Sequence, residues 1–232
     1  MHLLTSSIRL SGPLLKTPPL IRAVSTLSSN PHIYIHTTSP TTHILHLLPS
    51  TPPIESLSLG HSTSLPPTPS TFTPNPQFSP ILSRVLSQHA HLDPQLLSQA
   101  AAFATTSQAF TLSPSPRRRL APKTSTGAGG ASSQGGAGSG GRGGYIHLSD
   151  SRAPPDYGRI AYPEDIFGSL EVDASGNFVA GSEGKQAGNW QDSGTYRIVT
   201  REGVFGLTDF LRGKLVEELK KEEERIKREG GK

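Results

Sequence analysis

The sequence contains no cysteine, one methionine and one tryptophan among its 232 residues. The absence of cysteine excludes disulfides, thiolate metal sites and a cysteine nucleophile. No apolar run approaches the roughly 18 residues that a membrane-spanning helix needs, so no membrane span is expected. Apolar residues make up only 33% of the chain, which also carries 24 glycines and 21 prolines. This composition predicts that much of the chain cannot bury enough surface to fold alone.

Acidic residues are scarce in the first 149 positions, which hold Glu55 and Asp93 against nine Lys and Arg. Residues 150–232 instead hold 16 acidic and 13 basic residues. The net charge of +4 therefore comes from the front of the chain. It is weak evidence that a folded domain binds nucleic acid.

Residues 1–30 have the composition of a mitochondrial transit peptide, with three basic residues, several Ser and Thr, scattered Leu and Ile, and no acid. The segment RAVS, Arg22 to Ser25, resembles a matrix-protease cleavage site. Cations are drawn toward the negative side of a membrane potential, and an apolar face can bind import receptors. We expect a mitochondrial location, in the matrix, with an ordinary disordered terminus as the alternative.

Residues 31–112 are predicted to form a marginal unit of one hairpin and two short helices. The β-rich runs HIYIH (32–36) and HILHLLP (43–49) suit a hairpin. Helices are expected where Ser79 and Asp93 can act as caps, each before a proline at the first helical position. Such a unit has little stability of its own.

The hairpin carries four histidines that suggest a metal site, namely His32, His36, His43 and His46. His43 and His46 are an odd number of residues apart, so they lie on opposite faces of a strand. No nearby carboxylate could orient them. We expect no metal site and no cofactor.

Residues 113–144 read as a disordered, basic, Gly-rich linker. PRRR and GRGG within it are the features that leave RNA contact or a nuclear role open. Each occurs once, whereas RNA-binding boxes of this type act through repetition.

Residues 145–232 show local signals that agree on one fold. Strands are predicted in YIHL, EDIFGSLEVD, FVAG and TYRIVT, and Gly168 suggests a bulge or a close backbone approach. Thr208 should cap a final helix with a buried stripe of Leu211, Leu215 and Leu219. The charged extension beyond Leu219 is expected to face solvent or a partner.

The predicted fold class is therefore α+β. A small C-terminal module of a few antiparallel strands and one long C-terminal helix should follow largely disordered Pro/Ser- and Gly-rich segments.

A dense charged stretch with two tyrosines follows the first strand of this module. It is interpreted either as a recognition loop for an acidic partner or RNA phosphate, or as internal salt bridges that fix a proline-rich loop. A carboxylate pair from Asp156 with Glu164 or Asp165 would need a defined separation and a raised pKa, neither of which the sequence shows. A triad from His147, Ser149 and Asp150 is disfavoured because neighbours along one strand point apart. The candidate interaction residues are Arg152, Asp156, Tyr157, Arg159, Tyr162, Arg197 and Arg201.

The blocks PPDYGRIAYPEDIFGSLEVD (154–173) and SGTYRIVTREGVFGLTDFLRGKLVEEL (193–219) resemble a conserved family of fungal mitochondrial proteins. Members share a transit peptide, a proline-rich segment, a Gly-rich spacer and this C-terminal block. The resemblance implies a mitochondrial location and assigns no catalytic residue.

We expect a non-enzymatic interaction protein, either a ribosome-associated subunit or an assembly factor for a respiratory complex. Its partner would be a larger mitochondrial protein or ribonucleoprotein complex, and no small-molecule substrate is indicated. The alternatives are a small mitochondrial enzyme or enzyme accessory, and an RNA-linked or nuclear protein.

Overall fold

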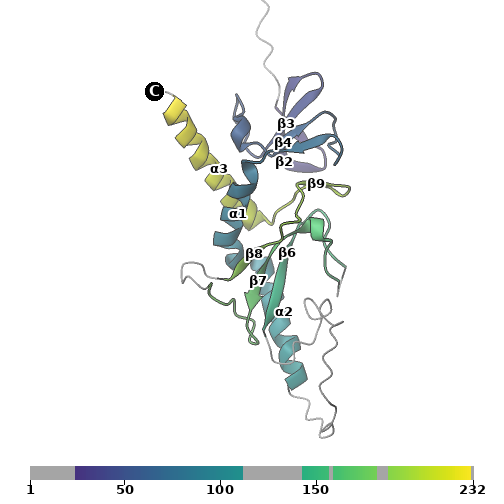
Figure 1. Ribbon diagram of the computed structural model, residues 1–232, viewed down its shortest axis with the longest axis vertical. Helices are drawn as coiled ribbons and strands as arrows, with labels where there is room; N and C mark the ends of the chain where they lie inside the picture. The colour runs from purple at the N-terminus through teal and green to yellow at the C-terminus, as the bar shows by residue number, and fades with distance from the viewer. Residues whose placement is uncertain (1–23, 112–142, 157–158, 182–187, 231–232) are drawn as a thin grey trace, which may run out of the picture.

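Two multi-stranded antiparallel sheets, a short strand pair and three α-helices form the part of the chain that the computed structural model describes, residues 24–111, 143–156, 159–181 and 188–230 (Figure 1). The first half contains β1 (Ser25–Leu27), β2 (Asn30–Ser39), β3 (Thr42–His46), the 3₁₀ turn η1 (Glu55–Leu57), β4 (Gly60–Ser62), β5 (Phe72–Pro74), α1 (Phe78–His89), the 3₁₀ turn η2 (Ala90–Leu92) and α2 (Pro94–Thr111). The second half contains β6 (Gly144–Ser149), the 3₁₀ turn η3 (Pro163–Asp165), β7 (Ile166–Val172), β8 (Trp190–Asp192), β9 (Val199–Thr200), β10 (Gly203–Val204) and α3 (Asp209–Gly230). The predicted α+β class, with antiparallel strands and a long C-terminal helix, is confirmed.

Strands β1 to β5 form a meander in which each strand pairs with the next. The predicted hairpin is its centre, where Ile35 of β2 lies opposite Leu45 of β3. Ile33, Ile35 and Leu45 are buried together because alternate side chains of a strand share a face. Residues 24–111 are thus far more ordered than the sequence suggested. Strand β1 also falls within the range 1–30 assigned to a transit peptide.

Both predicted helices of the first half exist, but only one predicted cap is correct. Asp93 Oδ1 accepts the N–H groups of Gln95 and Leu96 at 2.9 and 3.2 Å, which caps α2. Ser79 does not cap α1, which begins one residue earlier at Phe78. Asn75 organises that start, since its Oδ1 accepts the Gln77 N–H at 3.0 Å and its carbonyl the Phe78 N–H at 3.2 Å.

The second sheet has the order β6-β7-β8. A Cβ at Gly168 would lie 2.5 Å from the Gln191 carbonyl oxygen and against the Trp190 ring, so the predicted close backbone approach is confirmed. The third strand is Trp190–Asp192, not the predicted FVAG segment. Phe178 of that segment makes an isolated bridge to Val172.

The predicted strand TYRIVT is mostly not a strand. Only Val199 and Thr200 pair, with Val204 and Gly203 respectively. Tyr196 instead turns inward and stacks on Phe167, with ring centroids 4.1 Å apart. Tertiary contacts have overridden the local β propensity of this segment.

Helix α3 follows the predicted pattern through Leu219. Thr208 Oγ1 accepts the Leu211 N–H at 3.3 Å, and Leu211, Leu215 and Leu219 are fully buried. The charged extension was expected to face solvent or a partner, but one side of it packs on the body. Arg84 of α1 pairs with Glu218 and Glu222 of α3 at 3.0 and 3.1 Å, and Glu223 is 8% exposed.

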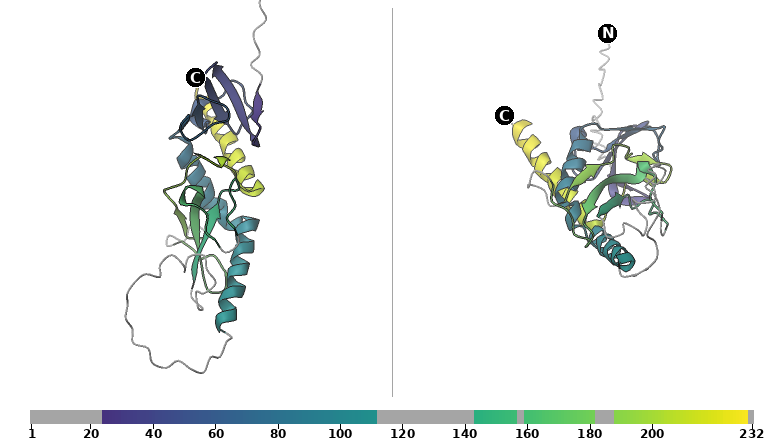
Figure 2. Two further views of the ribbon diagram at one scale, coloured as in Figure 1. Left: turned by 90° about the vertical axis from the view of Figure 1, so that its right-hand side faces the viewer. Right: turned by 60° about the horizontal axis from the view of Figure 1, so that its bottom comes forward.

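The two halves of the chain share one hydrophobic core. Helix α1 packs against α3, and its Ser83 Oγ donates to Asp192 Oδ2 of β8 at 2.7 Å. Phe78 of α1 meets Phe205 edge to face at 5.9 Å. Figure 2 shows α1 and α2, from the first half, lying along the elements of the second half. Residues 145–232 are therefore not a separate module, because first-half side chains complete their core.

None of the helices in the described ranges has both the length and the apolar character needed to cross a bilayer. This agrees with the expectation from the sequence.

Candidate interaction surface

The charged stretch after β6 divides into a buried part and an exposed part. In the buried part, Asp150 and Asp165 are 0% and 1% exposed, and the Arg152 side chain is 4% exposed. Arg152 Nη2 lies 2.7 Å from Asp165 Oδ1, and Nε lies 3.4 Å from Asp150 Oδ2. A buried arginine with two carboxylates is stable when its remaining donors are also satisfied.

Main-chain carbonyls satisfy those remaining donors. Arg152 Nη1 donates to Ile198 O at 2.9 Å, and Nη2 donates to Arg197 O at 2.7 Å and Glu164 O at 3.1 Å. Arg152 therefore ties together the strand before it, the η3 turn and the segment before β9. It is a structural residue, and its guanidinium is not free to bind a partner.

Tyr196 and Asp150 complete this network. The Tyr196 hydroxyl donates to Asp150 Oδ2 at 2.8 Å, while Asp150 Oδ1 accepts the N–H groups of Arg152 and Gly206 at 2.9 and 2.8 Å. Burial raises the pKa of Asp150 above its usual value, against the opposing effect of Arg152. Burial and the neighbouring Asp150 raise the pKa of Tyr196 well above 10. Both effects reflect a closed, water-poor cluster.

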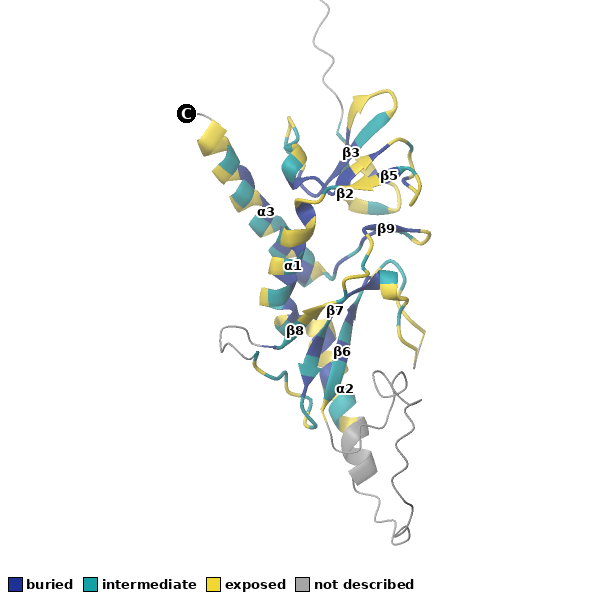
Figure 3. Ribbon diagram, viewed as in Figure 1, coloured by how far each residue is buried: buried dark blue, intermediate teal, exposed yellow. Residues whose placement is uncertain are grey.

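The exposed part of the stretch leads into η3 (Figure 3). The Arg159 side chain is 77% exposed and lies 4.0 Å from that of Asp156, which is 84% exposed. Tyr162 is 75% exposed and Ile160 43%. An exposed pair this open contributes little to stability, so Arg159 remains available to a partner.

Two hydrogen bonds place this exposed loop beside the segment before β9. Thr195 Oγ1 donates to Pro163 O at 2.8 Å, and the Arg197 N–H donates to Glu164 O at 3.1 Å. Arg197 is itself exposed. We name the surface formed by Arg159, Ile160, Tyr162 and Arg197 the cationic–aromatic surface.

The seven candidate residues from the sequence therefore fall into different environments. Arg152 is buried in the network, whereas Arg159, Tyr162 and Arg197 belong to the cationic–aromatic surface. Asp156 is exposed beside Arg159, and Arg201 is exposed in the turn between β9 and β10. Tyr157 lies outside the described residues.

An apolar groove of about 700 Å³ adjoins this surface at Arg197. One wall comes from β5 and the start of α1, with Phe72, Pro76 and Pro80, and the other comes from residues 192–199. No local pattern in the sequence predicts this groove. Its first wall lies in a proline-dominated segment more than a hundred residues before the second wall, and their proximity depends on the tertiary fold.

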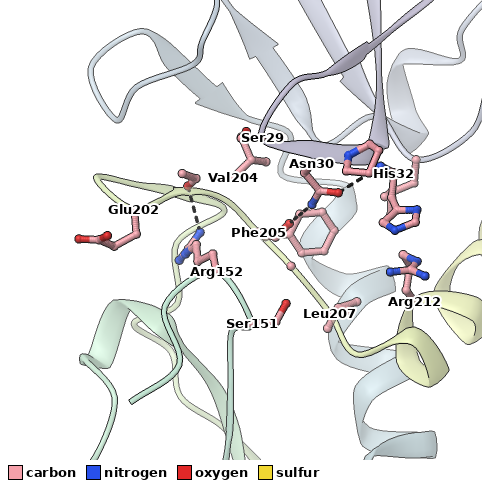
Figure 4. A pocket seen from close by; sticks show the side chains of 14 residues that line it. Ser29, Asn30, His32, Ser151, Arg152, Glu202, Val204, Phe205, Leu207 and Arg212 are labelled. Atoms are coloured by element: carbon pink, nitrogen blue, oxygen red, sulfur yellow. Dashed lines mark hydrogen bonds between the residues drawn. The ribbon is translucent and has the colours of Figure 1, made fainter. Parts of the chain in front are cut away.

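A smaller cleft of about 280 Å³ lies between the start of β2 and residues 202–207 (Figure 4). Asn30 crosses its floor, donating from Nδ2 to Phe205 O at 3.1 Å and accepting the His32 N–H at 3.1 Å. Arg212 also lines the cleft and pairs with Asp209 at 2.8 Å. The Asn30–Phe205 hydrogen bond therefore connects the two halves of the chain across this cleft.

The histidines do not assemble a metal centre within the described residues. His43 and His46 lie on opposite faces of β3, as expected, with His43 accessible and His46 buried. His46 Nδ1 accepts the Leu48 N–H at 3.0 Å and its Nε2 contacts Ile54 O at 3.3 Å, which identifies a neutral ring protonated at Nε2.

His147 does not form the triad considered with Ser149 and Asp150. Asp150 is committed to the buried network, and His147 Nδ1 lies 2.7 Å from Ser169 Oγ, across the β6–β7 pair. Burial lowers the pKa of His147, so its ring is neutral at neutral pH. Neither His147 nor Ser169 lines the groove or the cleft, so the pair acts as a cross-strand contact of the sheet.

The charge of the described part of the chain differs from that of the whole. It contains 12 Lys and Arg against 17 Asp and Glu, a net charge of −5. This part of the chain does not attract nucleic acid by its own net charge, while the other ten Lys and Arg of the chain lie outside the described ranges. The cationic–aromatic surface is a local exception on this body.

Comparison with known proteins gives no further assignment, because no family model, no curated protein and no solved structure matches this chain.

Proposed function

We propose that the chain is a non-enzymatic interaction protein of the mitochondrion, located in the matrix. It would act as a subunit associated with the mitochondrial ribosome or as an assembly factor of a respiratory complex. The location rests on the basic, acid-poor composition of residues 1–30 and on the family resemblance of residues 154–173 and 193–219.

One observation carries the interaction role. Tyr162, 75% exposed, precedes the η3 turn that the buried Arg152 network holds. It lies three residues after the exposed Arg159, on a loop hydrogen-bonded to the segment that carries the exposed Arg197. Tyrosine and arginine are the residues that most often dominate binding energy at protein interfaces. A tyrosine on a rigid support loses little side-chain freedom when a partner covers it, which favours binding.

The test is sedimentation of the full chain from mitochondrial extracts, with the variant Arg159→Glu/Tyr162→Ala beside the wild type. We expect the wild type to migrate with a large complex and the variant to shift to the free fraction. Lys220→Glu is the matched control, since Lys220 is an exposed residue on α3 and is not part of the cationic–aromatic surface. Migration of the wild-type chain solely as a free monomer, or a location outside mitochondria, would refute the proposal.

The alternative of an RNA-linked role is distinguished by salt. Binding through phosphate contacts weakens steeply as ionic strength rises. We expect the complex to persist in raised salt and to depend on Tyr162.

A further inference from the structure

The apolar groove has walls suited to apolar side chains. Beyond Phe72, Pro76 and Pro80, its lining includes Leu82, Ile198 and Val199. Its volume of about 700 Å³ lies within the range of ligand-binding clefts. The question is which class of ligand the remaining polar groups favour.

Of the two charged side chains at the groove, only that of Arg197 has no partner among the described residues. The Asp192 carboxylate is satisfied on both oxygens, by Ser83 Oγ at 2.7 Å and Trp190 Nε1 at 2.9 Å. The Arg197 side chain has no hydrogen bond or ion pair to any described residue. Its main chain is nevertheless held in place, by Glu164 and by Arg152. Arg197 thus offers a positioned, unpaired cation at an apolar groove.

The main chain along the second wall is also unpaired. The N–H and C=O groups of Gly194 and Tyr196 make no hydrogen bond within the described ranges, although Ser193 and Arg197 on either side bond to Phe167 and Glu164. These main-chain groups are available to hydrogen-bond a bound peptide.

We propose that the groove binds an extended segment of a partner polypeptide, with apolar side chains against the proline- and leucine-lined walls and a carboxylate paired with Arg197. This inference rests on the proposed interaction role and names the chemistry of its partner. An acidic segment complements Arg197, the charged side chain at the groove that has no partner among the described residues.

The experiment measures fluorescence anisotropy of a labelled probe peptide of alternating valine and glutamate, added to the full chain. A second probe has lysine in place of glutamate. We expect binding of the glutamate probe only. Arg197→Glu should weaken it by about tenfold, the effect of roughly one charge-assisted contact. Ser79→Trp, at an exposed position in the groove wall, should weaken it by obstruction.

Arg201→Glu is the matched control. It makes the same change of charge at an exposed arginine of the same strand region that does not line the groove. Its affinity should stay within about twofold of wild type, because screening leaves a distant exposed charge with little effect. Arg197→Gln removes the charge and keeps a polar side chain. Thermal unfolding of this variant shows whether it is folded, so that a loss of probe binding can be attributed to the missing charge.

Three results would overturn the inference. The first is that Arg197→Glu and Arg201→Glu weaken probe binding equally. The second is displacement of the probe by single-stranded poly-uridine. The third is that the chain forms a dimer in sedimentation equilibrium and that this dimer does not bind the probe. If the full chain migrates with a large complex but does not bind the probe, this inference is wrong and the proposed function is unaffected. Probe binding by a chain that is always a free monomer in mitochondria would do the reverse.

Discussion

The Thr208 hydroxyl donates a hydrogen bond to the Asp93 carboxylate, and each of these two residues also caps a helix. Asp93 caps α2 through Oδ1, while its Oδ2 accepts from Thr208, which caps α3. Asp93 is fully buried. One hydrogen bond therefore connects the beginnings of two helices that lie 115 residues apart in the sequence.

Removing either residue should destabilise the protein, and the two losses should not add. We expect Asp93→Ala to cost about 2 kcal/mol and Thr208→Val about 1 kcal/mol, since each removes a cap and Asp93→Ala also removes buried acceptors. A double-mutant cycle by urea unfolding should give a coupling energy of about 1 kcal/mol. Strictly additive effects would mean that the two caps are independent.

Replacing Arg152 should be among the most damaging single changes. Arg152→Leu leaves Asp150 and Asp165 buried without their cation, which costs about 3–5 kcal/mol. Arg152→Lys should recover little of this, because one ammonium cannot reach two carboxylates and three carbonyls at once. Arg159→Leu serves as the control and should change stability by no more than about 0.5 kcal/mol. A mild Arg152→Leu phenotype in chemical denaturation would contradict the network.

Stability should fall on acidification through His46. Burial lowers the pKa of His46 from 6.5 to about 4, so the unfolded chain binds a proton at higher pH than the folded chain does. The contribution is fully present above pH 6.5 and is lost as the pH falls toward 4, by about 3 kcal/mol in total.

His46→Gln should be less stable at neutral pH but should lose less on going from pH 7 to pH 4. Unfolding free energies of both proteins at several pH values test this. Parallel pH profiles for wild type and variant would show that His46 does not titrate as described.

The beginning of β1 limits where a presequence can end. Strand β1 starts at Ser25, the last residue of the RAVS motif, and Leu27 within it is buried. If the proposed mitochondrial import is correct, the mature protein should begin at or before Ser25, as read by N-terminal sequencing. A chain starting at Pro31 should lose β1 and the Asn30 contact to Phe205, and should unfold more readily by about 2 kcal/mol or more.

The sequence predicted best where the determinants are local. The Thr208 cap, the Leu211–Leu215–Leu219 stripe and the β2–β3 hairpin each depend on residues close together in the chain. Composition alone underestimates the folding of residues 24–111, because it takes no account of where the prolines and serines lie. Pro49 and Pro76 lie outside the strands, and the apolar residues between such breaks, such as Leu57 and Leu59, are buried.

The candidate site could be predicted only in part. Arg152 and Arg159 are alike in the sequence, each an arginine near acidic residues in a proline-rich loop. Their roles diverge because Asp165 and the carbonyls of residues 197 and 198 enclose the first and not the second. Tyr196 belongs to the same buried network, and most of the strand predicted around it does not form. Such long-range effects are invisible to local patterns.

The core shared by the two halves should hold them together even when the backbone between them is cut. Because Phe78 meets Phe205 and α1 packs against both α3 and β8, the contacts that join residues 24–111 to residues 143–230 do not depend on the peptide bonds between them. A protease cut between residues 112 and 142 should therefore yield two fragments that stay together and co-elute. Expressed as separate polypeptides, the two pieces should reconstitute one particle, and each should be poorly soluble without its complement.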